Sequence, residues 1–470
     1  MNNKCVIGID LGTSSAKVLC RYKNGDKINI KEKYDENTPR QWQGSVKKAL
    51  AGLAPEINAD DIEGIGLSAQ VGTYITETGG GVHVTMWNDG KDGAYLKKLL
   101  GRFTQEEFLR EISMPHPNMT SYPAPQLMQI NEKFKDIRRV CQPKDFLCET
   151  LTGNMATDMY SWRGLADLKS GRYSGALLGF AGVGAEKLPP FMGVTDKCGA
   201  LKPELAEECG LPGNIPVFVG CNDFFAALLG MGMQNYGDAF DITGTSEHIG
   251  VISEDIVINE KLVSGGYFDK NVCYGVTSSS GAAIDWALGM FGDANDTAED
   301  ISEILDNGPP VFLPYIKGEA RAPVWDPDAK GVFFGINDKA RGRELKYSVF
   351  EGVCFALFNI WENIGRGIGR LTVAGGAANN VTLNAVKAEL FGVPVDIPEE
   401  TDASALGAAM IASVGAGWHD SVYAAARQMG GRKNAAVPKG ACRGKLLQRY
   451  ETFKRLYPLL KTEFKNLGGM

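Results

Sequence analysis

Long apolar runs, paired cysteines and closely spaced histidines are missing from this 470-residue sequence. No stretch of 18 apolar residues occurs, which excludes an ordinary transmembrane helix, and the first apolar run contains Asp10, unlike a signal peptide. The ten cysteines form no CxxC pair and the four histidines no HxxxH pair, so neither a redox pair nor a histidine-built metal site is expected. Reduced, buried thiols in the cytoplasm are the simplest interpretation.

An excess of positive charge is also missing. The formal net charge of −7 argues against a nucleic-acid partner or an anionic membrane surface, because both need a basic face. Hydrophobic residues make up 44% and charged residues 22%, which are ordinary values for a globular protein. A chain of this length exceeds what one hydrophobic core usually serves, so we expect two domains or three.

Short β-rich runs alternate with helical patterns, which predicts α/β layers with helices covering mixed sheets. Strands are predicted at residues 5–10, 62–68, 82–87, 215–220, 239–243 and 371–374, and helices at 105–112, 126–139, 224–229, 348–364 and 442–467. The sequence IDLGTS at residues 9–14 is echoed by DITGTS at residues 241–246. The echo indicates two related domains that face one ligand, although so short a likeness can also arise by chance.

The first motif with chemical meaning is GIDLGTSSAK at residues 8–17. A tight glycine-containing turn presents backbone N–H groups and the hydroxyls of Thr13 and Ser14 to an anion. Lys17 adds a positive charge for a phosphoryl group, and Asp10 could order Mg²⁺ through water. The alternative is a plain hairpin turn with a solvated lysine. No Walker A motif occurs in the sequence.

A second motif, GCNDF at residues 220–224, follows a predicted strand and precedes an apolar helix. A carboxylate at the carboxyl end of a strand is well placed to act as a general base, and Asp223 is that candidate. The alternative is that Asp223 merely caps the helix.

A third motif, VAGGAANN at residues 373–380, places paired glycines after a strand. Glycines let a planar group lie against the backbone, and Asn380 offers an amide that both donates and accepts. A glycine-rich helix start is the alternative.

Together these motifs resemble the FGGY carbohydrate kinases, which are members of the actin/Hsp70/hexokinase-like superfamily. The most specific match is GVFFGI at residues 331–336 with ELKYSVFE at residues 344–351, which satisfies the family's second signature. The motifs run in the family's order from residue 5 to about residue 415. The resemblance implies two ribonuclease-H-like α/β domains, at residues 1–240 and 241–470, around a cleft for ATP and Mg²⁺.

The resemblance also implies a role for each motif. Thr13, Ser14 and Lys17 would approach the γ-phosphate, Asp10 would support Mg²⁺, and Asp223 would take the proton of the acceptor's primary hydroxyl. The remaining nucleotide contacts would come from the second domain: Thr245 near the phosphates, and Gly281, Asp285, Gly376, Ala377 and Asn380 around the adenosine. A homodimer is common in this family, although nothing in the sequence identifies an interface.

Several segments resemble the xylulose kinases in particular: MWNDGK at residues 86–91, PKDFL at 143–147, ATD at 156–158 and FLPY at 312–315. Two positions that contact the sugar in those kinases depart. Gly72 stands where a histidine is usual, and Phe224 stands where asparagine or glutamine follows the catalytic aspartate. Each lost polar contact would cost roughly 1–3 kcal/mol if it left a sugar hydroxyl unpaired.

The predicted acceptor is therefore a small sugar, with a ketopentose such as D-xylulose first, in a pocket lined by Gln70, Val71, Trp87, Asp89 and Phe224. The departures keep another ketose, a polyol or a less polar hydroxylated compound open. An alternative of another class is an actin- or Hsp70-like nucleotide switch that binds a protein.

Overall fold

The computed structural model describes residues 3–87, 89, 93–117, 119–292, 301–319, 321 and 323–468. The chain divides into two compact units, each built of several segments. The first comprises Met1–Gln234, Gly266–Asp269 and Asp402–Gly431, and the second Asn235–Gly265, Lys270–Thr401 and Arg432–Met470. The boundary near residue 240 between the two family domains stays a prediction. The compact units are divided differently, because Asp402–Gly431 packs in the first unit.

A six-stranded mixed sheet forms the centre of the first unit. Its order is β10 (Lys197–Ala200), β11 (Pro216–Asn222), β4 (Ile62–Ala69), β1 (Cys5–Leu11), β2 (Ser15–Tyr22) and β3 (Lys27–Lys33). The three strands β11, β4 and β1 run parallel, whereas β1, β2 and β3 form antiparallel hairpins. Smaller sheets are β6 (Gly81–Thr85), β5 (Tyr74–Thr78) and β7 (Ile137–Cys141), and β8 (Ala166–Asp167) with β9 (Arg172–Tyr173).

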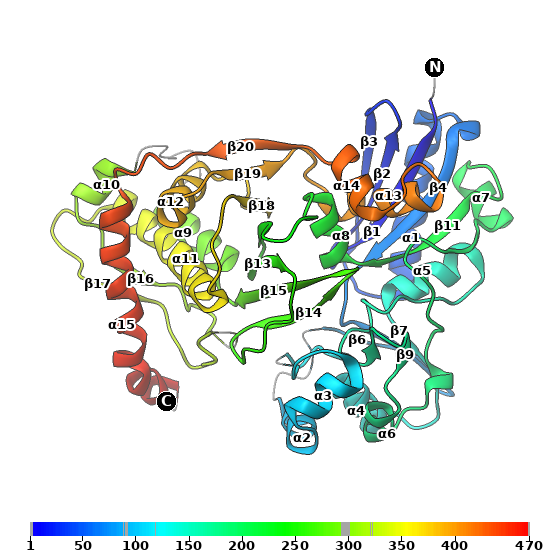
Figure 1. The fold of residues 1–470 in the computed structure, drawn as a ribbon, viewed down its shortest axis with the longest axis horizontal. Helices are drawn as coiled ribbons and strands as arrows, with labels where there is room; N and C mark the ends of the chain where they lie inside the picture. The colour runs from blue at the N-terminus through cyan, green and yellow to red at the C-terminus, as the bar shows by residue number, and fades with distance from the viewer. Residues whose placement is uncertain are drawn as a thin grey trace. The chain divides into compact units, whose positions relative to one another are not determined.

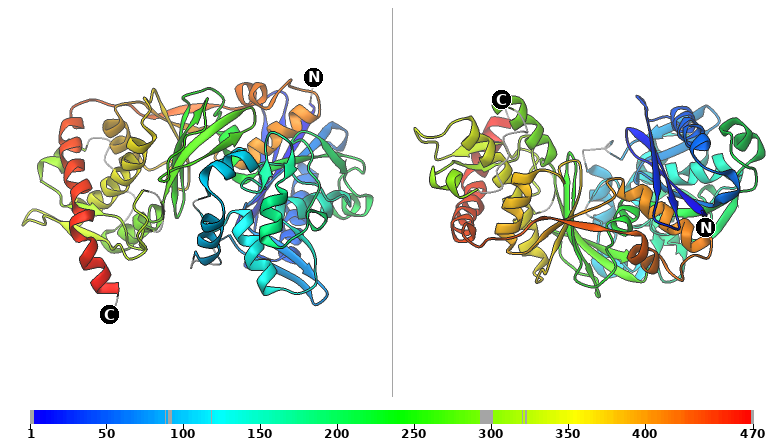
Figure 2. Two further views of the ribbon diagram at one scale, coloured as in Figure 1. Left: turned by 60° about the horizontal axis from the view of Figure 1, so that its bottom comes forward. Right: turned by 90° about the horizontal axis from the view of Figure 1, so that it is seen from above.

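Helices from distant parts of the sequence complete this unit. They are α1 (Pro39–Leu53), α2 (Ala94–Arg102), α3 (Gln105–Ile112), α4 (Pro123–Lys133), α5 (Pro143–Thr152), α6 (Gly175–Ala181), α7 (Pro203–Cys209), α8 (Asp223–Gly230), α13 (Ala403–Gly415) and α14 (Val422–Met429). Figure 1 shows α13, in orange, beside the blue strands β1, β2 and β4, and both views of Figure 2 show the same neighbourhood.

The helix α13 packs on the sheet and on α8 through main-chain contacts. A Cβ added at Gly8 would lie 2.0 Å from the Ala405 oxygen, and one at Gly407 would lie 1.9 Å from the Ala226 oxygen. No real Cβ tolerates such distances, so these positions accept only glycine. The small residues of α13 (ASALGAAMIASVG) therefore fix it against β1 and α8.

The sheet of the second unit has the same central strand order as that of the first, when the two orders are read from opposite edges. It runs β14 (Val263–Tyr267), β15 (Lys270–Thr277), β13 (Glu247–Ser253), β12 (Ala239–Thr243), β18 (Leu371–Gly375), β19 (Val395–Pro398) and β20 (Arg432–Ala436). Like β1, the central strand β12 has an antiparallel neighbour on one side and a parallel neighbour on the other. The predicted echo thus falls on equivalent strands, since IDLGTS ends β1 and DITGTS ends β12.

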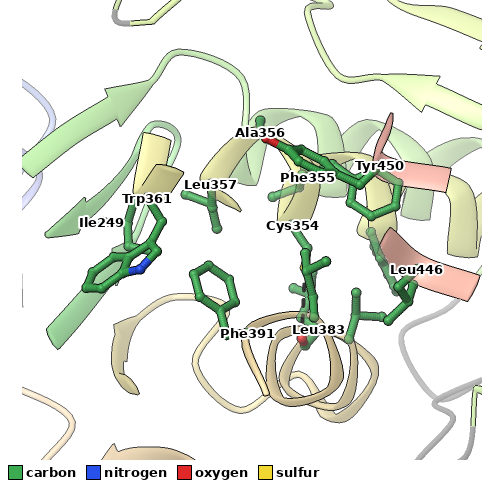
Figure 3. Packing of buried hydrophobic residues seen from close by; sticks show 14 of the residues in the cluster. Ile249, Cys354, Phe355, Ala356, Leu357, Trp361, Leu383, Phe391, Leu446 and Tyr450 are labelled. Carbon is green, nitrogen blue, oxygen red and sulfur yellow. Dashed lines mark hydrogen bonds between the residues drawn. The ribbon is translucent and has the colours of Figure 1, made fainter. Parts of the chain in front are cut away.

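The core of the second unit gathers around the long helix α11 (Gly342–Ile364), which presents Cys354, Phe355, Leu357 and Trp361 to its neighbours (Figure 3). The residues that surround them come from β13, α12 (Val381–Phe391) and α15 (Arg443–Gly468), and are Ile249, Leu383, Phe391, Leu446 and Tyr450. The remaining elements are α9 (Gly281–Phe291), α10 (Ser302–Asp306), β16 (Val311–Leu313) and β17 (Val332–Phe334).

Most predicted elements are present within a few residues, and one is wrong over part of its length. The helix predicted at residues 126–139 ends at Lys133, and Ile137–Cys141 forms β7. Phe134 takes an extended conformation at the helix end, so the helical pattern in the sequence continued past the real stop. In the described part of the chain, no helix is long and apolar enough to cross a membrane.

The contact of α13 with α8 predicts that G407A destabilises the protein, by about 1–3 kcal/mol or more, because the new methyl group has no space. Urea unfolding of the full chain measures this effect. G44A is the matched control, since Gly44 lies within α1 and a Cβ there meets nothing within 4 Å. This control should be neutral, or up to about 1 kcal/mol more stable. Equal unfolding midpoints for G407A and the wild type would contradict the packing.

Candidate active site

The register of the first sheet brings three polar side chains together. Asp10 on β1 lies opposite Lys17 on β2 and opposite Ser68 on β4. The Ser68 hydroxyl donates to Asp10 Oδ1 at 2.9 Å. Asp10 is only 3% exposed, and burial raises the pKa of its carboxyl group while the positive charge of Lys17 opposes that rise.

Lys17 is not a solvated hairpin lysine. Its Nζ lies 3.0 Å from Asp402 Oδ1, and about a quarter of each side chain is exposed. Burial alone would lower the pKa of Lys17, but the negative charges of Asp10 and Asp402 outweigh burial and raise it. The lysine therefore stays charged, as a phosphate-binding cation must.

The turn between β1 and β2 leaves Thr13 and Ser14 exposed. Two hydrogen bonds fix its shape: the Gly12 N–H donates to the Ser15 carbonyl at 3.0 Å, and the side-chain Nδ2 of Asn37 donates to the Thr13 carbonyl at 3.0 Å. The turn thus offers two hydroxyls on a rigid hairpin, next to Lys17, as an anion site would need.

Asp223 is the first residue of α8, directly after β11. The N-cap is Asn222, whose Oδ1 accepts from the Phe225 N–H at 2.9 Å. Asn222 rather than Asp223 is therefore the N-cap residue of this helix. β11 lies next to β4, with Cys221 opposite Ser68, so Asp223 comes to the edge of the sheet where Asp10 and Lys17 lie.

The environment of Asp223 disfavours its charge. Loss of solvent, together with the negative charge of Asp10, raises the pKa of this carboxyl group to about 7. Hydrogen bonds from the main-chain N–H groups of Phe224 and Val71 oppose the shift, the former at 2.9 Å. A carboxyl group with a pKa near neutrality is suited to accept a proton in the reaction.

The predicted acceptor residues differ in how accessible they are. Val71 is 37% exposed and Phe224 is half-buried, so both present apolar surface near Asp223. Gln70 is 2% exposed: its Nε2 donates to Asn37 and its Oε1 accepts from Thr73. Gln70 therefore supports the loop from within, and direct contact with an acceptor stays a prediction.

The segment at residues 86–91 lies partly outside the described residues, which include neither Asn88 nor Gly90 nor Lys91. Trp87 is half-buried, and its main-chain N–H donates to Thr73 Oγ1 at 3.4 Å. The Asp89 carboxylate accepts from the Met86 N–H at 2.9 Å and so closes a turn. Sugar contacts by Trp87 and Asp89 stay predictions.

Gly72 replaces the expected histidine for a backbone reason. Its φ is +80°, and a Cβ there would lie 3.2 Å from the Ser121 oxygen and 3.3 Å from the Trp87 Cβ. The Gly72 N–H donates to Gln142 Oε1 at 3.0 Å, and Gln142 Nε2 donates to the Ser161 carbonyl at 2.6 Å. The loop is therefore shaped for glycine.

A buried ion cluster lies behind this loop. Lys144 Nζ lies 3.3 Å from Asp145 Oδ1 and 3.2 Å from Asp158 Oδ2, and all three side chains are at most 2% exposed. Lys144 also donates to the Val219 carbonyl on β11 at 3.5 Å. The residues that resemble xylulose kinases here thus support the strand that leads to Asp223.

In the second unit, the predicted phosphate and adenosine loops touch. The Gly281 N–H donates to the Gly244 carbonyl at 2.9 Å, and the Ala282 N–H donates to Thr245 at 3.4 Å. A Cβ at Gly281 would lie 2.2 Å from the Gly244 oxygen, which explains the glycine. The structure brings Thr245 and Gly281 together, and Thr245 is exposed.

The loop after β18 adjoins the same strand end. The Gly376 N–H donates to the Thr243 carbonyl at 3.2 Å, and the Ala377 N–H donates to Thr243 Oγ1 at 2.9 Å. Asn380 caps α12, with Oδ1 accepting from the Leu383 N–H at 2.9 Å, so Nδ2 is the group that could donate to a ligand. Gly376 and Asp285 are exposed. Their nucleotide contacts stay predictions.

A second buried ion cluster lies below these loops, and the sequence did not reveal it. Lys387 Nζ lies 2.6 Å from Asp241 Oδ2 and 2.8 Å from Glu247 Oε1, with every side chain at most 1% exposed. Burial raises the pKa of Asp241, whereas Lys387 and Asp241 overcome burial and lower the pKa of Glu247. Ser280, before Gly281, donates to Glu247. The cluster thus ties β12, β13, α12 and the loop before α9 together.

The fold and these loops define a class: a two-unit α/β protein with the predicted phosphate loops at corresponding strands. Family models for the FGGY family of carbohydrate kinases match residues 5–230 (N-terminal domain) and 240–416 (C-terminal domain). The chain belongs to the FGGY family of carbohydrate kinases, as its motifs predicted, and is an enzyme that phosphorylates a sugar with ATP.

Curated and solved relatives extend over the whole chain. A xylulose kinase of Lactococcus lactis subsp. lactis is 28% identical over 498 residues, covering 98% of this chain and 96% of the relative. Crystal structures of a gluconate kinase and a xylulose kinase from Lactobacillus acidophilus superpose with TM-scores of 0.87 and 0.86, each at 20% identity. Each comparison covers 99% of this chain, and 99% and 100% of the solved chains respectively. The predicted fold class is confirmed.

The buried cluster in the second unit predicts that K387M lowers the free energy of unfolding by about 3–5 kcal/mol, because it leaves buried carboxyl groups without their cation. K445M is the matched control, since Lys445 pairs with Asp306 where both side chains are more than half exposed. We expect this control to leave the unfolding midpoint close to that of the wild type, because an exposed ion pair contributes little to stability. Equal effects of the two substitutions in urea unfolding would contradict the importance of burial.

Proposed function

We propose that this enzyme transfers the γ-phosphoryl group of MgATP to a primary hydroxyl of a small sugar, with Asp223 as the general base. The observation that carries the proposal is the environment of Asp223. This carboxyl group lies where β11 meets α8, close to Asp10, and its pKa of about 7 suits proton transfer at neutral pH.

In this proposal the acceptor's O–H gives its proton to Asp223 while its oxygen attacks the γ-phosphorus. The bond between that phosphorus and the bridging oxygen breaks, and ADP leaves. Thr13, Ser14 and Lys17 balance the charge of the phosphoryl group, because such transfer depends mostly on positioning and charge neutralisation. Thr245, Gly281, Asp285, Gly376, Ala377 and Asn380 would hold the rest of the nucleotide.

Asp10 fits Mg²⁺ in its chemistry. A buried carboxylate whose charge is disfavoured gains from a divalent cation, and Mg²⁺ usually takes one or two carboxylates with water and phosphate oxygens. In the described part of the chain, no group of three or more histidine, cysteine, aspartate and glutamate side chains could hold a metal. With Mg²⁺, phosphate oxygens of ATP and water would supply the other ligands, as is usual for this ion. Mg²⁺ would neutralise phosphate charge.

For the acceptor, D-xylulose is the first candidate, because curated relatives along nearly the whole chain are named xylulose kinases. The apolar surfaces of Val71 and Phe224, and the glycine-shaped turn at Gly72, favour a second candidate: another ketose, a polyol or a less polar hydroxylated compound. A homodimer and a cytoplasmic location stay predictions from the sequence.

A screen for ADP release over ketoses, aldoses, polyols and sugar acids identifies the acceptor. We expect one of these compounds to raise the rate well above ATP hydrolysis without acceptor. If D-xylulose stays at the hydrolysis background while another compound does not, the second candidate is correct. If none of these compounds raises the rate, both acceptor candidates are wrong.

The base assignment predicts that D223N lowers kcat by about 10²–10⁴-fold. In the wild type, kcat/KM for the acceptor should fall about tenfold per pH unit below pH 7, because the base must be ionised.

Folding raises the pKa of Asp223, so the stability that the protonated carboxyl group contributes is lost as the pH rises through about 7. D223N should therefore melt at a higher temperature than the wild type at pH 8. Near-normal turnover by D223N would contradict the assignment.

A further inference from the structure

Asp402 connects the C-terminal part of the chain to the β1–β2 hairpin through an ion pair with Lys17. It precedes α13, and its Oδ1 lies 3.0 Å from Lys17 Nζ on β2. The two residues are 385 positions apart in the sequence, and no sequence motif connects them. They meet because α13 packs on β1 through the close approach of Gly8 to Ala405.

The carboxylate of Asp402 does not serve the helix that it precedes. An aspartate at an N-cap usually accepts from the N–H groups of the first turn. Here the side chain makes no capping bond, and the Leu406 N–H makes the ordinary helical bond to the main-chain oxygen of Asp402 at 3.0 Å. The carboxylate lies against Lys17, so its position has an electrostatic rather than a helix-capping explanation.

Lys17 interacts electrostatically with three carboxylates: Asp10, Asp402 and Asp223. A lysine ammonium group on four flexible carbons can move among such partners. An ammonium group that rested on Asp223 would hold the base's lone pair, and one on Asp10 would compete with Mg²⁺. Asp402 is the only one of the three to which the proposed chemistry assigns no task.

We propose that Asp402 is a positioning residue for phosphoryl transfer. It holds the Lys17 ammonium group on the α13 side of the turn, where Lys17 meets the transferring phosphoryl group and leaves Asp10 and Asp223 to their own roles. The proposal rests on the proposed function, in which Lys17 contacts the γ-phosphate.

A double-mutant cycle tests this role in the full-length enzyme. D402N keeps a side chain that is favoured at helix starts but removes the charge. We expect D402N to lower kcat at saturating MgATP by about 10–100-fold, as misplaced catalytic groups do, with little change in the acceptor KM or the melting temperature. In a K17A background, D402N should change kcat by less than about twofold. D402E should recover part of the activity.

The control is E208Q, which removes the carboxylate of the exposed pair Lys47–Glu208 in the same unit and should leave kcat unchanged. Equal losses from D402N in the wild-type and K17A backgrounds, or wild-type turnover by D402N, would overturn the positioning role alone. Full activity of K17A would instead overturn the phosphate role of Lys17, and the positioning role with it.

Discussion

The contact of α13 with β1, β4 and α8 is the constraint on which the first unit depends. Gly8, Gly66 and Gly407 bring main chain against main chain, at distances that leave no space for a Cβ. This packing holds the strand that carries Asp10, the helix that begins with Asp223 and the residue that pairs with Lys17 as one rigid group. The geometry of the proposed phosphoryl transfer therefore depends on small residues that touch no ligand.

Burial of charge has different consequences in different parts of the molecule. Lys144 and Lys387 each lie between two carboxyl groups with almost no solvent exposure, and they stabilise the loops in front of them. Asp223 is also desolvated, but the largest charge effect on it is the like charge of Asp10, so its pKa rises towards neutrality. The same loss of solvent thus gives fixed ion pairs in the clusters and a titratable base at the site.

Much of the fold could be predicted from the sequence, because strands, turns and glycine motifs are local signals. The structure contains the predicted β1–β2 turn and the strand before Asp223. The echo between residues 9–14 and 241–246 falls on equivalent strands of the two sheets. What could not be predicted depends on distant contacts. The place of α13 in the first unit, the pairing of Lys17 with Asp402 and the Lys387 cluster arise only when the chain is folded. The run ALGAA after Asp402 was a usable signal, since alternating small residues indicate close helix packing.

The most direct test of this account is the ionisation of Asp223 itself, measured in the enzyme free of nucleotide and metal. The carboxyl resonances of ¹³C-labelled aspartate can be followed by NMR as the pH changes, with D223N identifying the signal. The account predicts a midpoint near pH 7 for Asp223 and a lower midpoint in D10N, because removal of the neighbouring charge favours ionisation. A midpoint near the ordinary aspartate value of about 4, unchanged in D10N, would contradict it.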